Sequence, residues 1–72
     1  MRDVTVRGDE IRLGQLLKLA GLAESGGDAK ALLAAGEVAV NGEPESRRGR
    51  QLADGDVVSA LGEDVRVSAA SG

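Results

Sequence analysis

The segment SGGDAKALLAAGEVAVNGEPESRRGR, residues 25–50, carries the local signals that decide the fold. Ser25 is a typical helix N-cap, and Asp28, three residues later, resembles the second partner of a capping box. The sequence therefore predicts a helix that ends near Ala35, because Gly36 suits the exit from a helix. The inner face of this helix is predicted to carry Ala29, Leu32 and Leu33.

A hairpin is predicted directly after this helix. Asn41-Gly42 follows the alternating residues 38–40, and Asn-Gly favours the positive φ angles that a two-residue type I′ turn requires at both positions. Pro44 cannot donate a ladder hydrogen bond, so the returning strand is expected to be short or to lie at a sheet edge.

Three arginines then occur within four residues, at Arg47, Arg48 and Arg50. This segment is expected to be a strand, in which Arg48 and Arg50 share one face and Arg47 takes the other, unless a bulge at Gly49 lets all three reach one surface. Guanidinium groups bind phosphate through a bidentate fork. A charged edge strand that resists aggregation explains the same residues, so spacing alone leaves both interpretations open.

Before the segment, the apolar period predicts another helix. The residues at positions i, i+3, i+4 and i+7 are Leu13, Leu16, Leu17 and Ala20. Gly21 is expected to end this first helix, and a connection of three or four residues then gives a helical hairpin. Asp9 or Glu10 is expected at the helix start, as a cap or a first-turn acid.

Short strands are predicted at both ends of the chain. Residues 4–6 alternate and end at Gly8, and Leu52 is expected to return to the core. Turns at 54–56 and 62–64 are predicted to bound strands at 57–61 and 65–67, followed by a disordered tail at 68–72. The elements predict one α+β domain, residues 1–67, in which a two-helix hairpin packs on a small, mostly antiparallel sheet of short strands.

The composition narrows the classes of function. The 72 residues include no Cys, His, Phe, Tyr or Trp, which removes disulfides, Cys-type zinc sites and the usual general base. No catalytic residue, metal or cofactor is expected. The net charge is −3, but the acidic excess lies in residues 54–72, and charges are screened beyond about 10 Å. No segment reaches the roughly 20 apolar residues of a membrane span, so a cytoplasmic protein is expected.

Several polar positions are candidates for anion binding. Backbone N–H groups at the start of the second helix attract anions, and Gly26 and Gly27 present no Cβ. Taken alone, these residues favour an ordinary capped helix, in which the glycines only ease the turn, over an anion site. Cationic side chains on both helices are candidates as well, although most such side chains are simply solvated. The full candidate set is Arg12, Lys18, Ser25, Gly26, Gly27, Lys30, Arg47, Arg48 and Arg50.

In this order and spacing, the motifs resemble the RNA-binding domain named after the fourth small-subunit ribosomal protein, the S-four domain with its alpha-L motif. The matching residues are Arg12-Leu13, Leu16-Leu17, Ser25, Ala29-Lys30, Leu33, Gly36, Val38, Val40-Asn41-Gly42 and Gly55-Asp56-Val57-Val58. The stretches LLKLAGLAESGGDAK and NGEPESRRGR are especially similar to small stand-alone bacterial members of the family.

The resemblance implies non-catalytic binding of structured RNA, ribosomal or transfer RNA, and a possible association with ribosomal particles. The two-helix face and the arginine-rich hairpin segment are the implied surface. Two positions depart from the family pattern: Gly14 stands where Asp is common, and Gly26 stands where many members carry Arg. Since the chain has no aromatic residue on which to stack bases, recognition of phosphate and shape is expected.

Two other functions remain open at the level of the sequence. A protein-interaction module would dock on an acidic or ribosomal protein surface. A homo-oligomer could form through sheet edges, although a monomer is expected.

Overall fold

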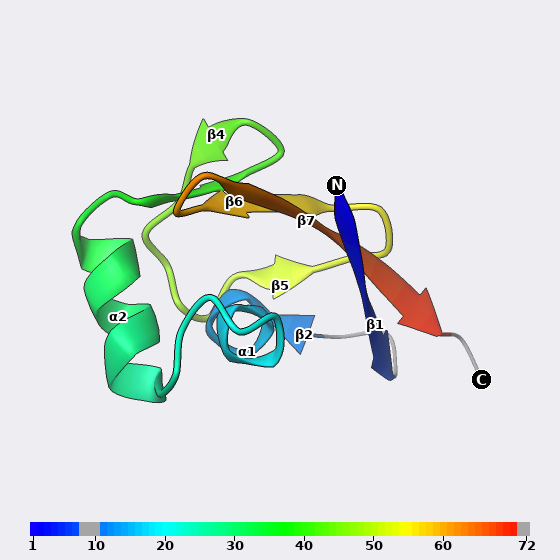
Figure 1. The fold of residues 1–72 in the computed structure, drawn as a ribbon, viewed down its shortest axis with the longest axis horizontal. Coiled ribbons are helices and arrows are strands. Elements are labelled where there is room, and N and C mark those ends of the chain that lie inside the picture. The colour runs from blue at the N-terminus through cyan, green and yellow to red at the C-terminus, as the bar shows by residue number, and fades with distance from the viewer. Residues whose placement is uncertain (8–10, 71–72) are drawn as a thin grey trace.

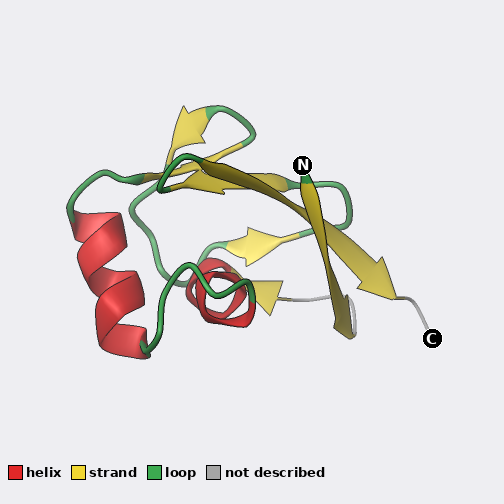
Figure 2. Cartoon of the chain, viewed as in Figure 1, coloured by secondary structure: helices red, strands yellow, loops and turns green. Residues whose placement is uncertain are grey.

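The computed structural model describes residues 1–7 and 11–70, apart from the side chain of Ala70. Figure 1 shows two helices on one side of a twisted sheet, and Figure 2 separates the helices, strands and loops by colour. The expected role of Asp9 or Glu10 at the helix start lies outside the described residues. The elements are β1 Arg2–Arg7, β2 Ile11–Arg12, α1 Leu13–Leu19, α2 Gly26–Ala34, β3 Val38–Val40, β4 Glu43–Pro44, β5 Gln51–Leu52, β6 Val57–Ala60 and β7 Glu63–Ala70.

The main sheet has five strands in the order β1-β7-β6-β3-β4. Three of its pairings are antiparallel, whereas β1 and β7 run parallel. A separate antiparallel pair, β2 and β5, lies beside α1 (Figure 1). The predicted α+β class with a small, mostly antiparallel sheet is confirmed, and the parallel edge makes the sheet a mixed one.

The predicted disordered tail is wrong for residues 68–70, which belong to β7 and pair with residues 5–7 of β1. The reason is that the alternation of Val65 and Val67 continues to Ala69, which packs against the core, while β1 supplies hydrogen-bonding partners for the backbone. The predicted turn at 62–64 is also displaced. Leu61 and Gly62 form it, with φ angles of 53° and 78°, and the strand begins at Glu63.

The two helices form where the apolar periodicity predicts them. The face Leu13, Leu16, Leu17 and Ala20 is buried, and Ala29 and Leu33 of α2 are buried as well. Residues 20–25 connect the helices, a longer connection than the three or four residues predicted, and it buries Leu22 and Ala23. Within the described residues, neither helix is long and apolar enough to cross a membrane.

The predicted hairpin and its turn are confirmed. Asn41 and Gly42 have φ angles of 52° and 84°, as a type I′ turn requires, and β4 is a two-residue edge strand. The Asn41 side chain donates to Asp56 at 3.1 Å and accepts from the Val57 N–H at 2.9 Å. These two hydrogen bonds connect the turn at 41–42 to the turn at 54–56 and to the start of β6.

Candidate nucleic-acid interface

Residues 45–50, here called the arginine loop, close over the start of α1. The Leu13 N–H donates to the Arg50 carbonyl at 2.8 Å, and the Gly14 N–H donates to the Arg48 carbonyl at 3.0 Å. The first N–H groups of a helix lack partners within the helix, and these carbonyls supply them. The predicted arginine-rich strand is therefore wrong: this segment is a loop with a turn at 48–49, and β5 begins only at Gln51.

The loop and both helices surround a surface hollow of about 410 Å³. That volume lies within the range of ligand sites in proteins. We call it the basic hollow; it is lined by Arg12, Gly14, Gln15, Lys18, Gly26, Ala29, Arg48 and Gly49. Its three charged lining residues are all cationic, and within residues 1–7 and 11–70 none of the three is in an ion pair.

Local contacts orient the side of the hollow formed by α1. The Arg12 guanidinium donates to the Gly49 carbonyl at 3.1 Å, which connects the helix start to the arginine loop. The Arg12 N–H donates to Gln15 Oε1 at 3.1 Å. Arg12, Gln15 and Lys18 are spaced three residues apart, so they lie along one side of the helix.

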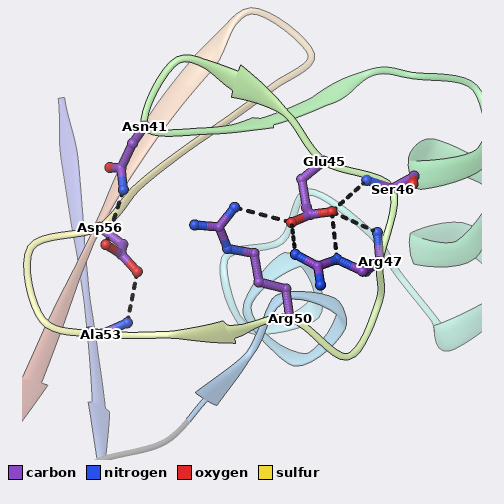
Figure 3. Close-up of polar contacts among 7 residues, drawn as sticks. All are labelled: Asn41, Glu45, Ser46, Arg47, Arg50, Ala53 and Asp56. Carbon is purple, nitrogen blue, oxygen red and sulfur yellow. Dashed lines mark hydrogen bonds and ion pairs between the residues drawn. The ribbon is translucent and has the colours of Figure 1, made fainter.

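Glu45 holds the other two arginines of the loop (Figure 3). Its carboxylate accepts from Arg47 at 3.1 and 3.2 Å and from Arg50 at 3.0 Å. It also accepts from the backbone N–H groups of Ser46 and Arg47, at 3.0 and 3.2 Å. The Glu45 side chain is only 9% exposed, whereas that of Arg47 is 75% exposed. Arg47 and Arg50 thus carry an intramolecular counterion, and only Arg48 of the three lines the basic hollow.

These contacts change the pKa of the groups involved. The Arg47 side chain, the strongest influence, together with its backbone N–H and Arg50, lowers the pKa of Glu45 from 4.5 to about 2. The same hydrogen bond and charge raise the pKa of Arg47. Glu45 therefore stays ionised at neutral pH and cannot act as a general acid there.

Glu45→Gln is expected to make the stability of the protein less dependent on pH in the acidic range. The pKa of Glu45 is about 2 in the folded chain and 4.5 ordinarily, so its stabilising effect is complete above about pH 4.5 and is lost as the pH falls through 2. The gap in thermal unfolding midpoint between wild type and Glu45→Gln should shrink between about pH 6 and about pH 2. A gap that stays constant over this interval would contradict the role given to the carboxylate.

The other predicted residues lie beside the basic hollow. Ser25 is the N-cap of α2, as predicted, and its Oγ accepts from the Asp28 N–H at 3.2 Å. Gly27 and Lys30 are exposed on α2 and do not line the hollow. The structure therefore brings together four of the predicted residues in the basic hollow: Arg12, Lys18, Gly26 and Arg48. Three more are next to these residues but do not line the hollow: Ser25, Gly27 and Lys30. The last two, Arg47 and Arg50, are paired with Glu45.

The candidate set predicted from the sequence lacked Glu45 and four residues that line the hollow, Gly14, Gln15, Ala29 and Gly49. The spacing of Gln15 from Arg12 and Lys18 was a usable signal. Glu45, two residues before Arg47, was a weaker one. The contact between Gly14 and the arginine loop has no local signal, because 34 positions separate Gly14 from Arg48 in the sequence.

The acidic residues near 54–56 form a turn, as predicted. Asp56 accepts from the Ala53 N–H at 2.8 Å, and Asp54 accepts from the Ala69 N–H at 2.9 Å. Gly55 has a φ of 90°. In the part of the chain that the structure describes, no group of three or more His, Cys, Asp or Glu side chains could hold a metal ion.

Comparison with known proteins gives a consistent result. The model of the family described as "S4 domain" matches residues 4–68. A protein of Bacillus subtilis (strain 168) named "Probable ribosome maturation protein RlbA" is 51% identical over 59 residues, which cover 82% of this chain and 83% of the relative. The "Putative RNA-binding protein YbcJ" of Escherichia coli (strain K12) is 42% identical over 59 residues, covering 82% and 84% of the two chains.

Proposed function

The chain belongs to the S4 domain family, whose domains bind RNA, and we propose that it binds structured ribosomal or transfer RNA without catalysing a reaction. The single observation that supports this most is the basic hollow, where Arg12, Lys18 and Arg48 face one space from two segments of the chain. We take the hollow as the contact surface for the RNA backbone.

The chemistry of the hollow suits a phosphate group. Two guanidiniums offer planar donor pairs that match phosphate oxygens, and Lys18 adds a flexible point charge. Gly26 is the first residue of the nine-residue helix α2, where unpartnered N–H groups and the helix dipole favour negative charge. A Cβ at Gly26 would meet nothing within 4 Å, so the space beside the helix start is open.

The overall negative charge does not oppose this proposal. The acidic excess lies in residues 54–72, and the described part of this segment forms β6, β7 and their turns, none of whose residues lines the basic hollow. Interactions between exposed charges fade over about 8–10 Å at physiological salt. Binding of a phosphate therefore depends on the cations next to it more than on the sum for the molecule.

Ribosomal RNA is the ligand that we propose first, with ribosomal particles as its context. The support is the name of the Bacillus subtilis relative, which refers to ribosome maturation. Such a ligand implies a cytoplasmic protein. We expect the chain to act as a monomer, because one copy supplies both helices and the arginine loop.

Affinity for ribosomal RNA is expected to fall as salt rises. Each neutralised phosphate contributes about 0.7–0.9 to the slope, so three cations give a slope of about −2 to −3 in a plot of log affinity against log salt. Fluorescence anisotropy with a labelled ribosomal RNA hairpin, a transfer RNA and single-stranded oligouridine measures it. The two structured RNAs should bind more tightly than oligouridine, because the chain has no aromatic residue for stacking.

A slope near zero would contradict the proposal. So would equal affinity for oligouridine and the structured RNAs. The alternative of a protein-interaction module makes the opposite prediction for complexes isolated from cells: ribonuclease would leave the protein attached to its partner, whereas an RNA ligand requires that it be released.

A further inference from the structure

Gly14 contacts Arg48 so closely that a side chain at position 14 of α1 would have no room. A Cβ placed on Gly14 would lie 2.5 Å from Arg48 Cγ and 3.3 Å from Arg48 Cδ. Carbon atoms at 2.5 Å overlap strongly, since their optimal separation is about 3.5–4.0 Å. The aliphatic part of Arg48 therefore occupies the position that any other residue at 14 would need.

The backbone at this contact is held in place. The Gly14 N–H donates to the Arg48 carbonyl at 3.0 Å, and the neighbouring Leu13 N–H donates to the Arg50 carbonyl at 2.8 Å. The Arg48 carbonyl oxygen would lie 3.5 Å from the added Cβ, an ordinary contact. A side chain at position 14 thus conflicts with the conformation of the Arg48 side chain and leaves these hydrogen bonds intact.

The three arginines of the loop have different surroundings. Arg47 and Arg50 are paired with Glu45, at 3.1 and 3.0 Å. Arg48 lines the basic hollow with Arg12 and Lys18. It is in no ion pair within the described ranges 1–7 and 11–70.

We propose that Gly14 is a positioning residue: by carrying no Cβ, it lets Arg48 lie across α1 and present its guanidinium in the basic hollow. Arg48 is then the ligand-contacting arginine of the loop, and Arg47 and Arg50 shape the loop through Glu45. This inference rests on the proposed binding of RNA at the hollow.

The test compares Gly14→Ala, Arg48→Ala and the double variant, using the labelled ribosomal RNA hairpin as the probe. Each single variant should weaken binding by roughly tenfold, the effect of losing one charge-assisted contact. The salt slope should decrease in magnitude by about 1 in each. The double variant should bind no more weakly than Arg48→Ala alone, because both changes remove the same contact.

Thermal unfolding separates positioning from damage to the fold. Alanine favours a helix more than glycine does, so the unfolding midpoint of Gly14→Ala should equal or exceed that of the wild type while its affinity falls. Arg66→Ala is the control for loss of one positive charge. Arg66 pairs with Asp3 on the sheet, at 2.8 Å, and its removal should change affinity less than twofold.

The outcomes distinguish this inference from the proposed function. If the wild type does not bind the hairpin, both fail. If the wild type binds, and Gly14→Ala keeps wild-type affinity or its effect adds to that of Arg48→Ala, the positioning role alone is overturned. A midpoint of Gly14→Ala more than about 5 °C below that of the wild type also overturns it, because the conflict then involves the backbone.

Discussion

Replacing Arg12, Lys18 and Arg48 together by alanine is expected to weaken binding of ribosomal RNA by two to three orders of magnitude. Each side chain lines the basic hollow, and a hydrogen bond to a charged group contributes about 1.5 kcal/mol or more, roughly tenfold in affinity. The salt slope should approach zero, since about 0.7–0.9 of slope is lost with each phosphate contact. Anisotropy titrations of the labelled hairpin at several salt concentrations measure both quantities.

The fold should survive this triple substitution. All three side chains are exposed, and surface replacements usually change the free energy of unfolding by less than about 0.5 kcal/mol. Among the hydrogen bonds and ion pairs of residues 1–7 and 11–70, the three side chains take part in one, from Arg12 to the Gly49 carbonyl, and the substitution removes it. Circular dichroism should show the same helix content in the variant and the wild type.

A second triple variant provides the matched control. Arg2, Arg7 and Arg66 lie on β1 and β7 and do not line the basic hollow. Replacing them by alanine also removes three positive charges. Screening should limit its effect on RNA affinity to about threefold. If both triple variants lose affinity equally, RNA responds to the total charge of the protein, and the basic hollow has no special role.

The parts of the fold that depend on neighbouring residues were predictable from the sequence. The helix period identified the buried face of α1, and Ser25 marked the start of α2 through its own hydroxyl. Asn41-Gly42 specified its turn because both residues tolerate positive φ. In each case the physical cause lies within a few residues of the signal.

The parts that depend on distant residues were not predictable in this way. The arginine loop resembled a strand, but its carbonyls are bound by the N–H groups of Leu13 and Gly14, far away in the sequence. The sequence predicts a disordered tail at residues 68–70 because they have little to bury, and their parallel partner β1 lies at the other end of the chain. The sequence also does not predict which arginines form ion pairs, because the pairing depends on how the loop folds around Glu45.

Leu17→Ala is expected to destabilise the protein by about 2–5 kcal/mol, the range for removing a buried leucine side chain. Leu17 is 0% exposed at the centre of a core built from Ala, Leu, Val and Ile, in a chain that has no aromatic residue to fill a new cavity. A single domain has only about 5–15 kcal/mol in total, and small domains tend toward the lower limit. For a loss of about 3 kcal/mol, the thermal midpoint should fall by roughly 12–24 °C.

Leu19→Ala is the control that separates the effect of losing a buried side chain from the effect of replacing leucine by alanine in a helix. It makes the same chemical change two residues later in α1, but Leu19 is 56% exposed. Its midpoint should stay within about 4 °C of the wild type, because an exposed leucine contributes little to the core. Since α1 carries Lys18 into the basic hollow and begins directly after Arg12, Leu17→Ala should lose RNA binding in step with unfolding, whereas Leu19→Ala should retain it. Equal destabilisation by the two variants would mean that α1 is not packed against the core as the burial of its residues indicates.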